Sequence, residues 1–191
     1  FVFGRAIRDA QRAHFTALSE AQNILFIGGG TGGSLKDLLQ VHPTAKVFYI
    51  EASQRMLRLA ANRLSDDERL RVTFLHGTEH DLPRHIRTDA VVVQFFVDMY
   101  SEKELMPLLQ RLYDVLPRHG LVFCADFVDD AWWQRAMLTV MYFFFRITTG
   151  LTNRTLSPWR KMFVQAGFQC EETNAFWHGF IFSALYRKNE G

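Results

Sequence analysis

Short apolar runs alternate with helical patterns along most of the chain. Five of these runs are predicted to be strands, at residues 23–27, 46–50, 71–75, 89–96 and 121–127. Between them, apolar residues recur every three or four positions, which is the spacing of a helix with one buried face. Regular alternation of strands and helices with short connections predicts a parallel sheet that has helices on both faces.

The end of the chain follows a different rhythm. Two strand-like runs, 168–176 and 179–186, are separated only by the residues around His178. That connection is too short for a crossover helix, so the two runs are predicted to pair as an antiparallel hairpin. We therefore predict an α/β fold with a doubly wound, seven-stranded, mostly parallel sheet that ends in this hairpin. Residues 1–191 are expected to form one domain, with an N-terminal helical segment over 1–20 and a helical lid or insertion over 128–160.

Five glycines stand within six positions, 28–33, directly after the first predicted strand. A helical pattern begins at Leu35, and the second predicted strand ends on Glu51. Glycine lets the backbone approach a ligand closely, and a helix N-terminus offers free N–H groups to a negative group. Glu51 can accept both hydroxyls of a ribose. Strand, glycine turn, helix, strand and acid in this order predict binding of an adenosine-containing cofactor.

The glycine spacing fits two kinds of cofactor site. Gly28, Gly30 and Gly33 match G-x-G-x-x-G, the dinucleotide pattern, which leaves an NAD(P)-dependent oxidoreductase as one alternative. Short-chain members of that class would carry a Tyr-x-x-x-Lys pair, and none of the five tyrosines has a lysine four residues later. Gly28, Gly30 and Gly32 match G-x-G-x-G, which looks like motif I of the S-adenosylmethionine (SAM) methyltransferases.

Four segments, 24–32, 48–56, 116–121 and 161–168, are similar to class I SAM-dependent methyltransferases. They correspond to motif I, the second strand with its ribose acid, the turn before strand five, and the passage into the hairpin that ends in Ala-Gly-Phe. The resemblance covers roughly residues 20–187. It implies SAM as the cofactor, S-adenosylhomocysteine as the product, and no metal. A SAM-fold protein that has lost activity and serves as an interaction module is a second alternative.

The resemblance implies a cofactor site at the carboxyl ends of the strands. Its expected cofactor residues are Gly28, Gly30 and Gly32 in the turn, Glu51 at the ribose, Ala52 and Met56 at the adenine edge, Gly77, Thr78 and Glu79 at the adenine, and Gln94 and Phe95 at the methionine part. The usual adenine acid falls on Thr78, so either Thr78 or Glu79 is expected to take that role. Asp98 and His178 lie near loops that would flank the acceptor and are candidates for a general base.

An unusually aromatic segment follows the fifth predicted strand. Four of its residues are predicted to line the acceptor pocket: Trp132, Trp133, Tyr142 and Phe145. An ordinary crossover helix needs only one apolar stripe, so the spare apolar surface must be covered by something. We predict a hydrophobic or aromatic acceptor. The alternative is an interior helix or a homodimer face.

Composition and motifs indicate which kind of methyl acceptor and which cellular location to expect. The formal net charge is only +2, and no base-methylation motif of the type [Asp/Asn/Ser]-Pro-Pro-aromatic is present, so a small organic acceptor is favoured over nucleic acid. The longest apolar stretch, 136–145, is shorter than the ~20 residues of a membrane span, so none is expected. Cys124 and Cys170 are both expected to be buried thiols. They suit a reducing compartment, and the predicted location is the cytoplasm.

Overall fold

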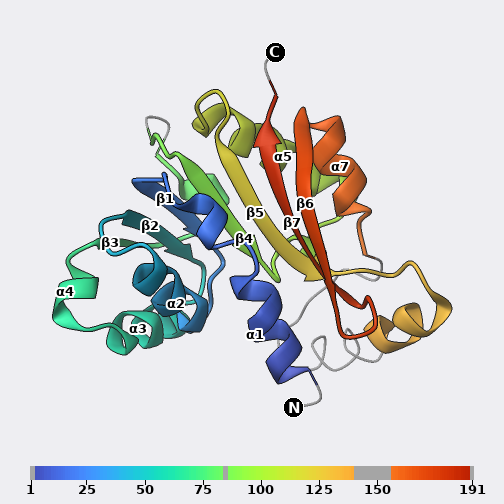
Figure 1. Cartoon of the computed structure of the whole chain (residues 1–191), viewed down its shortest axis with the longest axis horizontal. Helices are drawn as coiled ribbons and strands as arrows, with labels where there is room; N and C mark the ends of the chain where they lie inside the picture. The colour runs from blue at the N-terminus through green and yellow to red at the C-terminus, as the bar shows by residue number, and fades with distance from the viewer. Residues whose placement is uncertain (1–2, 84–85, 140–155, 190–191) are drawn as a thin grey trace.

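The strands form one seven-stranded sheet in the order β3-β2-β1-β4-β5-β7-β6 (Figure 1). The computed structural model describes residues 3–83, 86–139 and 156–189. The five parallel strands are β1 (Asn23–Ile27), β2 (Lys46–Glu51), β3 (Val72–His76), β4 (Ala90–Gln94) and β5 (Leu121–Phe127). The antiparallel strands β6 (Phe168–Phe176) and β7 (Ile181–Lys188) complete the sheet beside β5. The predicted fold class is therefore confirmed.

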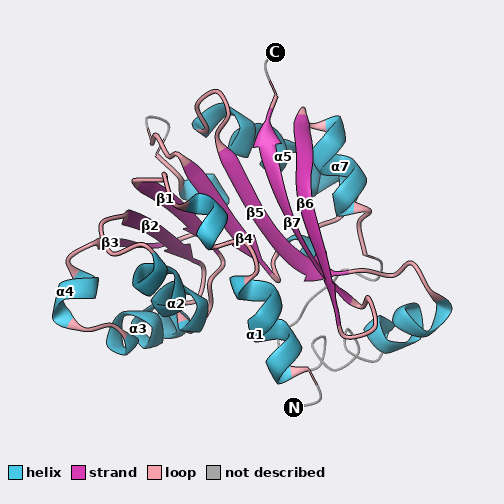
Figure 2. Cartoon of the chain, in the orientation of Figure 1, coloured by secondary structure: helices cyan, strands magenta, loops and turns pink. Residues whose placement is uncertain are grey.

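Helices cover both faces of the sheet (Figure 2). They are α1 (Gly4–Arg12), α2 (Gly33–Val41), α3 (Gln54–Arg63), the short α4 (Asp66–Arg69), α5 (Glu102–Val115) and α7 (Trp159–Gln165), and residues 132–139 are also helical. Alternate residues of each strand face opposite sides, so Leu25 and Ile27 pack in the core under α5 and α7, while Ile24 and Phe26 pack in the core under α2 and α3. β4 is buried at every position because both faces are covered.

Side-chain caps fix where the helices begin. Ser53 precedes α3 and accepts a hydrogen bond from the N–H of Met56 at 3.3 Å. Ser101 and Glu104 form a reciprocal capping box at the start of α5. α3 thus begins soon after the carboxyl end of β2, while the turn Val97–Met99 separates β4 from α5. The loops at these strand ends form the candidate site.

The carboxyl ends of the parallel strands point to the lower edge of the sheet in Figure 1, where α1 and the helical residues 132–139 also lie. A third apolar cluster joins these segments to the hairpin. Its buried members are Ala10, Phe127, Leu138, Phe180 and Ile181. None of the described helices is both long and apolar enough to cross a membrane.

Within the N-terminal segment, α1 ends at Arg12 and a separate single helical turn spans Thr16–Leu18. Two local expectations were wrong. β4 ends at Gln94 rather than at residue 96, because Phe95 has a φ of 51° and leaves the extended conformation. Cys170 is exposed, since it lies on the edge strand β6, and only Cys124 is buried.

Candidate functional site

The glycines of the turn after β1 have different surroundings. Gly28, Gly30 and Gly32 have φ values of 65°, 60° and 75°, in the left-handed region that favours glycine. A Cβ on Gly28 would lie 2.4 Å from the ring of Phe96, and one on Gly32 would lie 2.7 Å from the backbone of Ala60. A Cβ on Gly30 would meet nothing within 4 Å. Gly28 and Gly32 are thus required by packing, whereas Gly30 borders open space.

Glu51, the last residue of β2, is tied to this turn. Its Oε2 accepts a hydrogen bond from the N–H of Gly30 at 3.0 Å, and its Oε1 accepts one from the N–H of Ser53 at 2.9 Å. The hydroxyl of Tyr49 donates to the carbonyl of Gly30 at 2.9 Å. Burial raises the pKa of Tyr49 further above its ordinary value, and the hydroxyl is a proton donor at neutral pH. Each oxygen of Glu51 keeps a free lone pair for a further donor, which suits a vicinal diol.

A cavity of about 160 Å³ lies at the carboxyl ends of β1 and β2. Its lining residues are Ile27, Gly28, Ile50, Glu51, Ala52, Gly77, Thr78, Glu79, Phe96, Met99 and Tyr100. The structure therefore brings together most of the residues predicted for the adenosine end. Small-molecule pockets usually measure about 300–1,000 Å³, so this cavity can hold one end of a ligand. Met56 is 40% exposed and does not line it.

The far wall of the cavity carries a hydrogen bond that the sequence did not predict. The hydroxyl of Tyr100 donates to Oε2 of the buried Glu79 at 2.8 Å. The neighbouring Thr78 is occupied within its own turn: its hydroxyl donates to Asp81 at 3.2 Å and accepts the N–H of His80 at 3.3 Å. The other oxygen of Glu79, Oε1, lies 3.2 Å from Nε2 of His80. A carboxylate still has more lone pairs to offer an adenine amine than the Thr78 hydroxyl.

Gln94 and Phe95 do not line this cavity and contact other parts of the structure. The side-chain carbonyl of Gln94 accepts a hydrogen bond from the Ser34 hydroxyl at 2.6 Å, and its amide donates to the carbonyl of Gln11 at 2.9 Å. Gln94 thus links α1, β4 and the first turn of α2. The ring of Phe95 lies 5.1 Å from that of Phe127.

Asp98 stands in the single turn Val97–Met99 that follows β4. Burial raises the pKa of this partly exposed side chain to about 6. Behind the turn lies Asp126, a fully buried carboxyl near the end of β5 that sequence reasoning missed. Burial and then the nearby charge of Asp98 raise the pKa of Asp126 well above its usual range. One signal was present in the sequence, since this aspartate interrupts an otherwise apolar strand.

The residues predicted for the acceptor side are spread apart. His178 is exposed in the turn between β6 and β7. Trp132 is 79% exposed, while Trp133 packs edge-on against Trp177 with 5.7 Å between ring centroids. Tyr142 and Phe145 lie outside the described residues. Within the described ranges no three His, Cys, Asp or Glu side chains group closely enough to hold a metal ion.

Comparison with known proteins gives a family match and several relatives. The family model of the O-methyltransferase domain matches residues 6–169. Isoflavone-7-O-methyltransferase 6 of Medicago sativa is 23% identical over 155 residues, which are 78% of this chain and 41% of that protein. Demethylmenaquinone methyltransferase of Thermotoga maritima is 30% identical over 100 residues, 52% of this chain and 41% of that protein. The chain therefore spans less than half the length of these curated relatives.

Solved structures share the fold. The mitomycin 7-O-methyltransferase MmcR has a TM-score of 0.74 and 16% identity, with 97% of this chain and 54% of that chain covered. Human N-acetylserotonin methyltransferase, solved in complex with SAM, has a TM-score of 0.67 and 18% identity, with 95% and 52% covered. A SAM-dependent methyltransferase from Mesorhizobium loti has a TM-score of 0.74 and 13% identity, and the match covers 98% of this chain and all of that one.

Proposed function

The chain belongs to the O-methyltransferase family, and we propose that it transfers a methyl group from SAM to a small hydrophobic or aromatic acceptor. The family match also confirms the resemblance to class I SAM-dependent methyltransferases that the sequence suggested. The observation that carries the proposal is the convergence of Glu51 and the glycine turn on one cavity. No described feature favours the oxidoreductase alternative.

The residues around the cavity suit the adenosine end of SAM. Glu51 would accept hydrogen bonds from the two ribose hydroxyls with its free lone pairs. The open space beside Gly30 would hold part of the cofactor. Ala52 would supply an apolar contact to the adenine. Glu79, already held by Tyr100, would accept a hydrogen bond from the adenine amine. Phe95, which follows β4 outside the cavity lining, and Gln94 would contact the methionine part of the cofactor.

SAM supplies a methyl group on a positively charged sulfur, which makes the leaving group good without further activation. The chain must then orient the acceptor, exclude water and remove a proton. Asp98 is proposed as the general base, because its pKa of about 6 leaves it mostly ionised at neutral pH yet still basic. Its turn also contributes Met99 to the cavity wall. His178 is the second candidate for this role.

An apolar acceptor fits the aromatic cluster beside this turn. Phe95 packs on Phe127, and Phe127 packs on Phe180 with 5.0 Å between ring centroids. Trp133 joins the same cluster. Several relatives are named for small organic acceptors, among them isoflavone, norcoclaurine and 3-aminomethylindole. We propose an acceptor of comparable size.

Two measurements test the proposal. In isothermal titration, SAM and S-adenosylhomocysteine should bind at micromolar concentration and NADH at least ~100-fold more weakly, a difference of about 2.7 kcal/mol. A panel of phenolic and heteroaromatic acceptors with labelled SAM should then reveal turnover. Binding of SAM without turnover of any acceptor would favour an interaction protein. Tight NADH binding without SAM binding would overturn the proposal.

A further inference from the structure

We propose that Asp126 is the positioning residue for Asp98: its carboxyl group holds the backbone of the turn that carries the base. This inference rests on the proposed function for its catalytic part. Its structural part stands on the contacts of Asp126 alone. Nothing in the sequence pattern pairs these two residues, which lie on different segments and meet only because β4 and β5 are neighbours in the sheet.

The need for such a residue follows from the way β4 ends. The last paired residues of the two strands are Gln94 and Ala125, and the N–H of Phe95 still donates to the carbonyl of Ala125 at 2.7 Å. Phe95 then takes a positive φ of 51°, a conformation that side-chain-bearing residues seldom adopt. The chain leaves the sheet at that point, so the next N–H groups have no strand opposite them.

Asp126 is the acceptor for all of these groups. Its Oδ2 accepts the N–H of Phe96 at 3.0 Å, of Val97 at 2.9 Å and of Asp98 at 3.2 Å. Its Oδ1 accepts the N–H of Phe127 at 2.8 Å. The side chain is fully buried, and an unpaired polar group there would be strongly destabilising. Four donors on one carboxyl group offset that cost and fix the turn at three consecutive residues.

The turn held in this way carries several parts of the site. The ring of Phe96 covers Gly28, and Phe96 and Met99 both line the cavity. Asp98 lies between them in sequence. A shift of the turn by about 1 Å would misplace the base relative to the acceptor, and errors of that size can lower a rate about 100-fold. Asp126 therefore acts on the reaction through Asp98 and touches neither ligand itself.

The test compares Asp126→Asn and Asp126→Ala with a matched control. Asp89 also accepts backbone N–H groups, but it lies just before β4, at the amino ends of the parallel strands. Its Oδ2 accepts the N–H groups of Gln22 at 2.9 Å and Asn23 at 2.8 Å. Asp89→Asn should expose those two amides to hydrogen exchange and leave kcat within about twofold, because it lies far from the carboxyl ends of the strands.

For Asp126→Asn we expect kcat to fall about 30-fold or more while the Kd for SAM changes less than about fivefold. Asparagine keeps one oxygen for the turn but places an NH₂ group against the N–H of Phe127. Alanine removes both acceptor oxygens, so Asp126→Ala should be more severe. Amide exchange at residues 96–98 should speed up at least about tenfold in both variants. If Asp126→Ala does not fold, the asparagine variant carries the test.

A double mutant shows whether the effect passes through Asp98. Asp98→Asn combined with Asp126→Asn should be no slower than Asp98→Asn alone, since a base that is already absent cannot be misplaced further. Additive losses, or unchanged kcat despite faster exchange at 96–98, would overturn the positioning role. Unchanged exchange would overturn the structural part. A wild-type chain that transfers no methyl group would instead refute the proposed function, and exchange would still report on the turn.

Discussion

At the scale of single residues, the glycine turn after β1 shows that similar positions have different tasks. Gly28 makes room for the ring of Phe96, and Gly32 makes room for the backbone of Ala60. Gly30 has open space where its side chain would stand. Among these three glycines only Gly30 has room for a side chain, although the sequence motif treats all three alike.

Gly30→Val should abolish SAM binding, because a branched side chain would fill that open space and strain a backbone with a φ of 60°. The matched control is Gly33→Ala. Gly33 begins α2 and also has no neighbour within 4 Å, so the substitution should raise the free energy of unfolding by about 0.5–1 kcal/mol and leave SAM affinity unchanged. Titration calorimetry and urea unfolding check both; wild-type affinity in Gly30→Val would place the cofactor elsewhere.

Glu51→Ala should weaken SAM binding at least ~30-fold, because hydrogen bonds to a carboxylate contribute about 1.5–3 kcal/mol each. Calorimetry with SAM measures the loss. Glu102→Ala, which removes an exposed carboxylate at the start of α5, serves as the control and should bind SAM normally. Equal affinities in the two variants would mean that Glu51 only supports the turn through Gly30 and Ser53.

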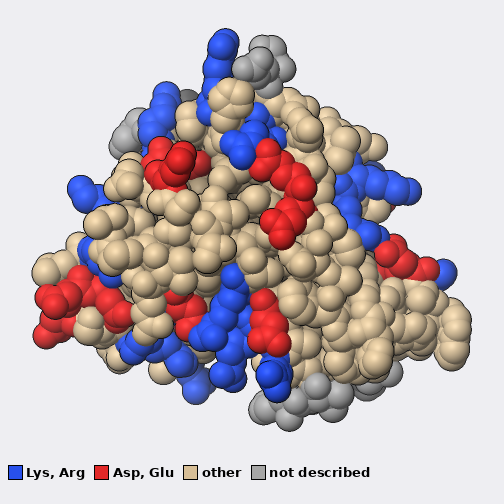
Figure 3. All heavy atoms as spheres, in the orientation of Figure 1, with Lys and Arg blue, Asp and Glu red and all other residues tan. Residues whose placement is uncertain are grey.

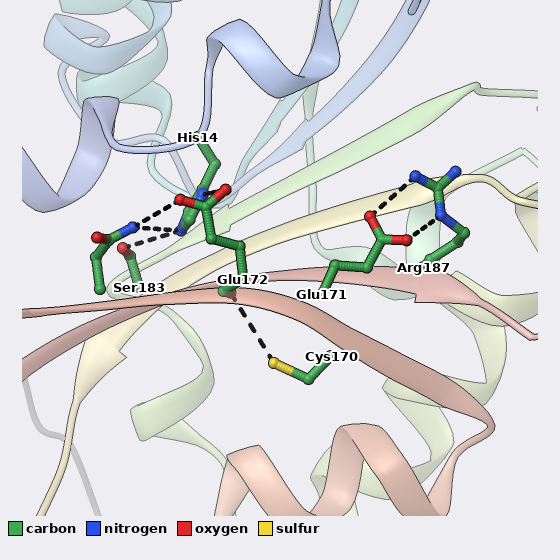
Figure 4. Close-up of polar contacts among 7 residues, drawn as sticks. His14, Cys170, Glu171, Glu172, Ser183 and Arg187 are labelled. Atoms are coloured by element: carbon green, nitrogen blue, oxygen red, sulfur yellow. Dashed lines mark hydrogen bonds and ion pairs between the residues drawn. The ribbon is translucent and has the colours of Figure 1, made fainter.

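At the scale of elements, the turn that follows α1 contacts the C-terminal hairpin through His14 (Figure 4). The side chain of His14 is fully buried, and its Nε2 lies 3.3 Å from the hydroxyl of Ser183 and 3.4 Å from the amide of Asn174. Its Nδ1 has no hydrogen-bond partner and lies 3.6 Å from a carboxylate oxygen of Glu172. Phe123 packs edge-on against the ring. An uncharged imidazole suits these surroundings.

Stability should therefore fall in mild acid. Burial lowers the pKa of His14 below its ordinary value of 6.5, although Glu172 opposes the shift. Below about pH 6.5, His14 binds a proton more readily in the unfolded chain than in the folded chain, so the free energy of unfolding decreases as the pH falls. Above that pH, the contribution of His14 to the free energy of unfolding is constant. Urea unfolding between about pH 5 and 8 measures the slope.

Two variants identify the group responsible. His14→Leu should flatten the slope, and Glu172→Gln should steepen it, because removing the carboxylate lowers the pKa of His14 further. His80→Gln removes a histidine whose side chain is 82% exposed and should leave the slope as in the wild type. A slope that survives His14→Leu would assign the acid sensitivity to another residue.

At the scale of the whole molecule, the third apolar cluster joins three segments near the carboxyl ends of the parallel strands: α1, residues 132–139 and the hairpin. Trp133→Ala should lower the free energy of unfolding by about 2–3 kcal/mol, since its ring packs on Trp177 and Phe180. Trp132→Ala should change it by less than about 0.5 kcal/mol, because that ring is 79% exposed. Chemical denaturation measures both.

The exposed Trp132 then distinguishes the two uses predicted for this segment. A raised acceptor KM in Trp132→Ala, with SAM affinity unchanged, would support a lid over the acceptor. A change from dimer to monomer in light scattering, with normal acceptor kinetics, would support a homodimer face. If neither quantity changes, Trp132 serves neither use.

Surface charge is mixed on the face drawn in Figure 3, where Lys and Arg alternate with Asp and Glu. Several charged residues of the chain are paired, as Arg12 is with Asp37 at 2.6 Å and Arg160 with Asp130 at 2.5 Å. The formal net charge is only +2, so a small organic acceptor is still predicted in preference to nucleic acid.

Four features could be predicted from the amino-acid sequence alone: the order of strands and helices, the terminal hairpin, the glycine turn and the acid at the end of β2. These features depend on periodicity and on turn residues that lie next to one another, so local chemistry decides them. The adenosine end of the candidate site followed from them, because the ends of neighbouring parallel strands necessarily meet. The end of β4 was misjudged, since backbone conformations such as that of Phe95 depend on distant packing.

Contacts between side chains far apart in the chain became known only from the folded structure. Gln94 bonds to Gln11, 83 positions away, and Asp126 holds a turn about 30 positions before it. Tyr100 reaches Glu79 across the cavity, and the edge position of β6 leaves Cys170 exposed. Each contact depends on strand register and on which helix covers which face. Those are properties of the assembled sheet, because residues far apart in the chain become neighbours only when it forms.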